Sequence, residues 1–163
     1  MEKPSASAPA VLHELAEHLA SGVVIYVATA DAQRAPEAMF GMGAKIDCER
    51  RVVTLYLAAP SREATLENLA RDPRIAATFT RPADHKSLQV KGRVLRVRES
   101  TEADRDVQAV HRAALVEQFA GVGIPRATTR RVVWWPSVAV ELEVCDVFTQ
   151  TPGPRAGEQL AAL

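Results

Sequence analysis

The chain has 163 residues, of which 47% are hydrophobic, and this is enough to fill one compact core, so no second domain is expected. Its 20 basic and 20 acidic side chains balance, which argues against a nucleic acid or an anionic membrane as partner. The apolar runs are far shorter than the roughly 20 residues of a membrane span, and the first residues do not resemble a signal peptide. We therefore expect a cytoplasmic protein that binds a small molecule or another copy of itself.

The first third of the chain predicts one helix followed by three strands. Residues 1–9 are rich in small residues and proline, which predicts a flexible N-terminus. Leucines at helical spacing predict an amphipathic helix over residues 12–19, which ends at Gly22. Strands are predicted over residues 23–30, 37–47 and 52–58.

A short helix between two strands is predicted in the middle of the chain. Ser61 is a good N-cap residue, and Glu63 in the first turn suits the positive end of the helix dipole. Asp72-Pro73 ends this helix, because the residue before a proline is disfavoured in the α region. A strand follows over residues 74–80, and a longer one begins near His85 and contains a β-bulge at Gly92.

The last third predicts a long helix and a final strand. Thr101 caps a helix over residues 102–120, and alternating apolar residues predict a strand over residues 138–144. Six strands with helices at these places fit a mainly β, α+β fold, an antiparallel barrel with flanking helices, better than a βαβ fold. Residues 10–150 form the predicted domain and residues 151–163 a C-terminal tail.

No metal site is expected from the cysteines and histidines. Cys48 and Cys145 lie far apart and lack the spacing of metal ligands or of a disulfide framework. His13 and His18 are five residues apart, whereas a zinc-binding helix face needs a spacing of four.

From residue 52 to residue 92 the order of motifs resembles the FMN-binding split β-barrel proteins related to pyridoxamine 5′-phosphate oxidase. The strand VVTLYLAAP is followed by Ser61-Arg62, by a short helix that closes on Asp72-Pro73-Arg74, and by Gln89-Val90-Lys91 before Gly92. The resemblance covers roughly residues 10–150, and the tail QTPGPRAG looks like that of an uncharacterised bacterial branch. It implies a six-stranded antiparallel split β-barrel, FMN as cofactor, and a homodimer with two sites at its interface. The implied activity is an oxidoreductase that acts on an unknown small-molecule substrate.

The phosphate of FMN is expected at the start of the short helix. Arg62 lies where free N–H groups and the helix dipole favour an anion, although a solvated surface arginine is the competing interpretation. By the resemblance, Ser61 and Thr65 support the phosphate. The family has a lysine after Ser-Arg, whereas this chain has Glu63, whose charge opposes a phosphate. Lys45, Lys86 or Lys91 can substitute for that lysine, and the sequence leaves open which of them points inward; Lys86 is included among the candidate site residues.

The flavin ring is expected near four further residues. Gln89 matches a family glutamine that hydrogen-bonds the ring, and an amide can both donate and accept. Tyr56 and Leu57 match positions whose backbone lines the flavin. Trp134 precedes the last strand, where the family has an aromatic residue that reaches the flavin across the dimer interface.

Two other functions remain open from the sequence. One is a non-redox split barrel that has lost FMN and serves as a ligand-binding or interaction protein, for which Glu63 is the best argument. The other is a barrel that holds a deazaflavin or haem in the same groove. No side chain is predicted to be catalytic, because a flavin carries the redox chemistry itself.

Overall fold

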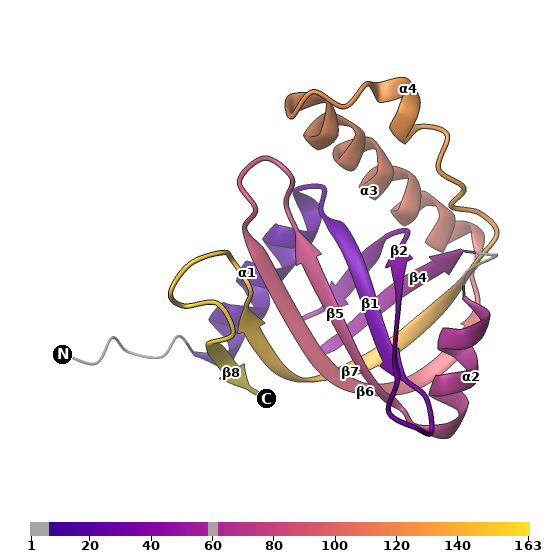
Figure 1. Cartoon of the computed structure of the whole chain (residues 1–163), viewed down its shortest axis with the longest axis vertical. Helices are drawn as coiled ribbons and strands as arrows, with labels where there is room; N and C mark the ends of the chain where they lie inside the picture. The colour runs from indigo at the N-terminus through magenta and orange to yellow at the C-terminus, as the bar shows by residue number, and fades with distance from the viewer. Residues whose placement is uncertain (1–6, 59–61) are drawn as a thin grey trace.

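The computed structural model describes residues 7–58 and 62–163, shown in Figure 1. Their helices and strands, in chain order, are α1 (Ala8–Ala20), β1 (Val24–Ala30), β2 (Pro36–Gly41), β3 (Ala44–Asp47), β4 (Val52–Ala58), α2 (Glu63–Arg71), β5 (Arg74–Thr80), β6 (Ser87–Glu99), α3 (Glu102–Gly121), α4 (Arg126–Thr129), β7 (Ser137–Thr149) and β8 (Gln159–Ala162).

One antiparallel sheet contains all the strands of the described residues. Its order is β2-β1-β5-β6-β7-β4-β3, and β8 pairs with β7 outside this path. The sheet does not close on itself, and its two longest strands, β6 and β7, pair in the middle and join the two halves. The predicted α+β fold, an open antiparallel barrel with flanking helices, is confirmed.

The sheet of the described residues has eight strands where the sequence predicted six. The strand expected over residues 37–47 is interrupted between β2 and β3, where Gly43 has a φ of 150°. Tyr56 bonds both sides of the break: its N–H donates to the Gly43 carbonyl, and its carbonyl accepts from Met42. The eighth strand, β8, comes from the residues predicted to be a tail.

The predicted bulge lies opposite Gly92. Lys91 pairs with Asp146 and Gly92 with Val144, so Cys145 of β7 has no pairing partner on β6. A Cβ atom on Gly92 would lie 2.0 Å from the Glu143 carbonyl oxygen, so the close approach of β6 and β7 requires glycine here. Extra residues in a ladder bend the strand and increase its twist, which curves this sheet into a barrel.

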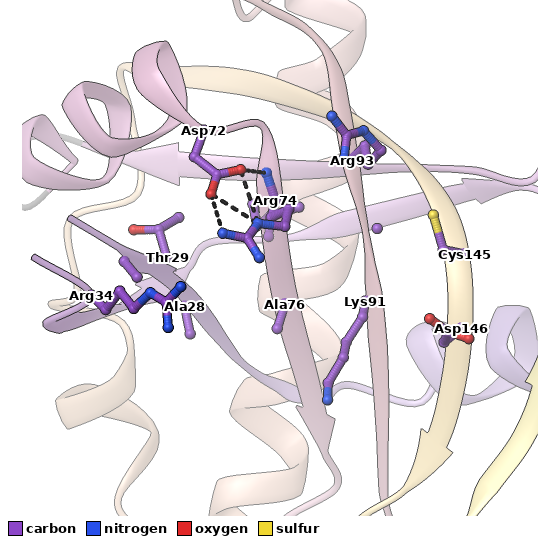
Figure 2. A pocket seen from close by; sticks show the side chains of 13 residues that line it. Ala28, Thr29, Arg34, Asp72, Arg74, Ala76, Lys91, Arg93, Cys145 and Asp146 are labelled. Atoms are coloured by element: carbon purple, nitrogen blue, oxygen red, sulfur yellow. Dashed lines mark hydrogen bonds and ion pairs between the residues drawn. The ribbon is translucent and has the colours of Figure 1, made fainter. Parts of the chain in front are cut away.

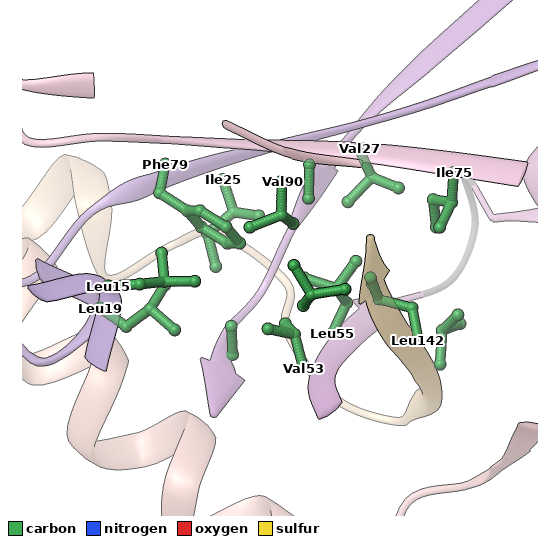
Figure 3. Packing of buried hydrophobic residues seen from close by; sticks show 14 of the residues in the cluster. Leu15, Leu19, Ile25, Val27, Val53, Leu55, Ile75, Phe79, Val90 and Leu142 are labelled. Carbon is green, nitrogen blue, oxygen red and sulfur yellow. The ribbon is translucent and has the colours of Figure 1, made fainter. Parts of the chain in front are cut away.

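The core fills the inside of the curved sheet, and α1 closes one end. Leu15 and Leu19 of α1 pack against strand residues that point inward (Figure 3). These residues include Ile25, Val27, Val53, Leu55, Ile75, Phe79, Val90 and Leu142. The alternation of buried and exposed residues along β1 and β5 places their other face outward, where ligands or partners have access.

The helices α3 and α4 lie together beside the barrel, beyond the end of β1 and β2 in Figure 1. The helix α3 begins with a capping box, in which Thr101 and Asp104 bond each other's backbone N–H. Near its other end, the Gln118 amide donates to the Ser21 carbonyl at 3.0 Å, which ties α3 to the end of α1.

None of the helices in residues 7–58 and 62–163 combines the length and the apolar character needed to cross a membrane.

Candidate functional site

The start of α2 places two buried polar groups without hydrogen-bond partners close together in the chain. Arg62 is the N-cap residue, and its Nη1 atom is buried without a partner among the described residues. Thr65, in the first turn, is fully buried, and its Oγ1 atom also lacks a partner there. Unpaired buried donors are costly, and the first N–H groups of any helix have no partner within the helix. This end of α2 therefore suits an anion such as a phosphate.

Two further residues of α2 lie near Arg62 and Thr65: one anchors the helix to the sheet, and the other carries a negative charge that would oppose a bound anion. Asn68, one turn further along α2, donates from Nδ2 to the Thr29 hydroxyl of β1 at 3.1 Å, so it fixes the helix to the sheet. Glu63 is exposed, which places its carboxylate in contact with solvent and weakens its repulsion of an anion. The predicted Ser61 lies outside the described residues.

Tyr56 and Leu57 are part of the protein interior. Both side chains are fully buried, and the Tyr56 hydroxyl donates to Asp104 of α3 at 2.8 Å. Burial and this contact with a carboxylate raise the pKa of the Tyr56 phenol well above its usual range, so the phenol keeps its proton. The backbone N–H and carbonyl of Tyr56 are bonded to Gly43 and Met42.

Gln89 lies on the outer face of β6 in a short polar network. Its Nε2 donates to the Thr78 hydroxyl at 2.9 Å, and its Oε1 accepts from Gln150 at 3.3 Å. These two bonds use one N–H and one lone pair of the amide and fix its orientation. One N–H and one lone pair remain for a ligand.

The three lysines considered for the phosphate differ in their partners. Lys86 donates to Glu14 of α1 at 2.7 Å, and Lys45 lies 3.4 Å from an Asp104 carboxylate oxygen. Lys91 makes no ion pair within the described residues, and its Nζ lies 4.6 Å from the centre of the Phe148 ring. Of the three, Lys91 therefore retains an uncompensated charge.

Trp134 lies half-buried between α3 and the loop before β7. The Arg112 guanidinium is 5.7 Å from the centre of its ring, and Trp135 is 6.3 Å away, ring centre to ring centre. Trp134 therefore packs against α3, and it makes no bond to Gln89 or to α2.

The structure separates Gln89 from the start of α2 within one chain. Gln89 pairs with Phe148 of β7, whereas Leu57, at the end of β4, pairs with Val138. These partners are ten residues apart on one strand, which corresponds to a path of about 33 Å.

A groove on the outer face, which the sequence analysis did not identify, includes Lys91, two residues along β6 from Gln89. Its cavity volume is about 690 Å³, and small side chains such as Ala28 and Ala76 form its floor (Figure 2). Arg34, Lys91 and Arg93 border it and make no ion pair within the described residues, whereas Arg74 is bonded to Asp72. Arg34 follows β1, Arg74 lies on β5, and Lys91 and Arg93 lie on β6, so no single stretch of the sequence contains all four cations. The groove offers positive charge beside a flat apolar floor.

No family model and no curated protein sequence matches the chain. Solved structures do match it. A putative pyridoxamine 5′-phosphate oxidase from Lactobacillus delbrueckii has a TM-score of 0.52 and 17% identity, over 83% of this chain and 91% of that chain. A protein related to general stress protein 26, of the pyridoxinephosphate oxidase family and from Clostridium acetobutylicum, has a TM-score of 0.54 and 14% identity, over 88% of this chain and 90% of that one. An F420 reductase has a TM-score of 0.50 and 15% identity, over 80% and 93% of the two chains.

These likenesses establish the fold. The chain has the split-barrel fold of pyridoxamine 5′-phosphate oxidase-like proteins, so the resemblance predicted from residues 52–92 is confirmed at this level.

Proposed function

We propose that the chain is a cytoplasmic, homodimeric flavoprotein that binds FMN and oxidises or reduces a small molecule. The proposal is carried by two buried polar atoms at the start of α2, Arg62 Nη1 and Thr65 Oγ1, which have no hydrogen-bond partner among the described residues. The split-barrel fold shared with a putative pyridoxamine 5′-phosphate oxidase supports it. Bound FMN supplies the hydride or electron transfer, and the protein supplies orientation and electrostatics.

Arg62 and Thr65 would hold the phosphate. A guanidinium can donate two parallel hydrogen bonds to phosphate oxygens, and the Thr65 hydroxyl adds a third donor. The N–H groups of the first turn of α2 complete the set, and the helix dipole favours the negative charge. Because Glu63 is exposed, its opposing charge reduces phosphate affinity without preventing binding.

Gln89 would orient the flavin ring. Thr78 and Gln150 already fix its amide, which leaves one donor and one acceptor facing outward. A flavin ring edge carries neighbouring carbonyl and N–H groups that such an amide can bond.

Two subunits would be needed to assemble one site. Gln89 and the end of β4 that precedes α2 pair with residues near opposite ends of β7, so each would serve a different site of a dimer. The exposed apolar side chains Tyr26, Phe40 and Leu95, between 47% and 55% exposed, support a partner surface on the outer face. By the resemblance, Trp134 would approach the flavin of the partner subunit.

The substrate would enter the groove on the outer face of the sheet. Arg34, Lys91 and Arg93 border it, and their charges favour a small anion.

A visible absorption spectrum of the purified protein tests the proposal, recorded before and after addition of excess FMN and gel filtration. Flavin bands that stay with the protein are expected, at one FMN per chain, together with a dimeric mass by light scattering. A colourless protein that retains no FMN would reject the flavoprotein.

The second candidate is a non-redox, ligand-binding split barrel. Glu63 at the phosphate position supports it, as do the ion pairs that neutralise Lys45 and Lys86. A deazaflavin or haem in place of FMN would reveal itself in the same spectrum, through a deazaflavin band or a Soret band.

A further inference from the structure

A second cavity, of about 230 Å³, lies between α3 and the β1–β2 hairpin. Its wall is mostly apolar and includes Val24, Ile25, Leu115, Phe119, Val132 and Trp134. A buried apolar cavity of about 150 Å³ is large enough for benzene, so this one has room for a ring and a substituent. It is smaller than the roughly 300–1,000 Å³ of pockets for drug-sized molecules, so a whole flavin does not fit.

Three residues of the cavity wall carry buried polar atoms without partners among the described residues. These atoms are His111 Nε2, Arg112 Nε and Thr129 Oγ1. His111 and Thr129 are only 7% and 8% exposed, so water does not readily replace the missing partners. Leaving buried polar groups unpaired is costly, and the cost is larger for a charged group. A ligand with matching polar atoms would remove this cost.

The charge at the polar end of the cavity is positive. Arg112 donates from Nη2 to the Arg130 carbonyl, directly after Thr129, which brings its guanidinium to the segment that carries the Thr129 hydroxyl. Trp134 lies against the guanidinium, and no carboxylate within the described residues forms an ion pair with it. The Nε–H of Arg112 and the hydroxyl of Thr129 both donate, so an anionic acceptor complements them.

His111 offers the opposite polarity. The Val23 carbonyl lies near the His111 ring, and because Nε2 has no partner among the described residues, the nitrogen that faces this carbonyl is Nδ1. A carbonyl can only accept, so Nδ1 carries the proton and Nε2 has the lone pair. An N–H or O–H group on a bound ring can donate to it.

We propose that this cavity binds a planar aromatic monocarboxylate, with the ring among the apolar side chains and the carboxylate on Arg112 Nε and Thr129 Oγ1. A one- or two-ring acid fits the volume. Binding in this cavity requires no flavin, so this proposal does not depend on whether the protein retains FMN.

Isothermal titration calorimetry with indole-3-carboxylate and indole-3-carboxamide tests the proposal on the full-length protein. The two probes have the same ring and nearly the same size, but only the first carries a charge. The carboxylate is expected to bind about 10-fold more tightly, as for a hydrogen bond to a charged group. Equal affinities, or no binding of the acid at millimolar concentration, would overturn the proposal.

Variants locate the binding in the cavity. Arg112→Met is expected to lower carboxylate affinity to that of the amide, and Arg112→Lys to restore part of the difference. Val132→Trp places a large ring at the cavity wall and is expected to lower the affinity for both probes at least 10-fold. Val133→Trp is the matched control, because Val133 is 62% exposed and does not line the cavity. Val132→Trp with wild-type affinity, in a protein that melts like wild type, would place the binding elsewhere.

Discussion

The Tyr56 hydroxyl donates a 2.8 Å hydrogen bond to Oδ1 of Asp104, which joins strand β4 to the first turn of α3. Arg98 of β6 donates to the other oxygen at 2.5 Å, and the Thr101 N–H does so at 2.9 Å. Burial alone would raise the pKa of Asp104, but these donors hold it well below its usual range. The carboxylate therefore stays charged and fixes α3 to the barrel. Because α3 forms one wall of the cavity of about 230 Å³ beside the β1–β2 hairpin, this wall is fixed as well.

Replacing Asp104 should lower the free energy of unfolding more than replacing Tyr56. Asp104→Asn leaves the Arg98 charge without its main partner and is expected to lower the free energy of unfolding by about 3 kcal/mol. Tyr56→Phe removes one hydrogen bond and should cost about 1–2 kcal/mol. Urea denaturation of both variants and of the double variant measures the coupling, and a coupling energy below about 0.5 kcal/mol would show that the two residues act independently.

Gly92→Ala tests the close approach of β6 and β7. The added Cβ atom would meet the Glu143 carbonyl oxygen at 2.0 Å, so the strands must separate, and we expect a loss of about 3 kcal/mol or more. Gly121→Ala is the control, because a Cβ atom there meets nothing within 4 Å and alanine favours the helix. Equal stability of the two variants in urea would mean that the bulge accommodates a side chain at no cost.

The fold could be predicted from local sequence signals, and the structure contains the features that they predict. The helical spacing of Leu15 and Leu19, the cap at Thr101 and the phase shift at Gly92 all lie within one element and its neighbour. The break at Gly43 was not foreseen, because it depends on hydrogen bonds to Tyr56, a partner distant in sequence. Strand β8 was missed because its glycine- and proline-rich approach is typical of a loop.

The candidate sites were predictable only in part. Arg62 and Thr65 belong to one linear motif, and Arg62 Nη1 and Thr65 Oγ1 have no hydrogen-bond partner among the described residues, so their role in binding stays a prediction. Lys86 forms an ion pair with Glu14, 72 residues away in the sequence, so no local sequence pattern predicts this contact. The groove on the outer face and the cavity between α3 and the β1–β2 hairpin are each lined by residues from several segments. These residues can be recognised as sites only when the fold has brought them together.

Arg62→Ala should weaken FMN binding while preserving the fold. Loss of a hydrogen bond to a charged group corresponds to about 1.5–3 kcal/mol, which is a factor of roughly 10 to 150 in Kd. Quenching of flavin fluorescence on titration measures the affinity. Arg71→Ala, an exposed arginine in the last turn of the same helix, is the control and should bind FMN like wild type. An unchanged Kd for Arg62→Ala would remove this residue from the site.

Glu63→Lys should tighten FMN binding. The change replaces a negative charge with a positive one in the first turn of α2, where the helix dipole already favours an anion. Because Glu63 is exposed, the expected gain is small, about 0.3–1 kcal/mol, and it should shrink as salt is raised. The same titration at low and high ionic strength measures it, and a weaker complex would place the phosphate away from this turn.

His18 should make the stability of the protein depend on pH in one direction. It is 3% exposed, and its Nε2 donates to the Phe79 carbonyl at 2.9 Å, which ties α1 to β5. Burial lowers the pKa of His18 below 6.5, with smaller contributions from nearby Lys86 and Arg81.

As the pH falls below about 6.5, the unfolded chain takes up a proton that the folded chain does not, so stability is lost. His111, whose pKa is also lowered by burial, acts in the same direction. Free energies of unfolding in urea between pH 5 and pH 8 should therefore rise with pH and level off above about pH 7.

Replacement of His18 by glutamine, which can still donate to the Phe79 carbonyl, should make this rise shallower. His13→Gln, on the exposed side of the same helix, is the control and should leave the rise as in wild type. If the stability of His18→Gln varied with pH as steeply as that of wild type, the folded protein would accept a proton on His18 as readily as the unfolded chain does. The added proton would be on Nδ1, so the charged imidazole would keep its bond to Phe79 and its Nδ1–H would reach solvent.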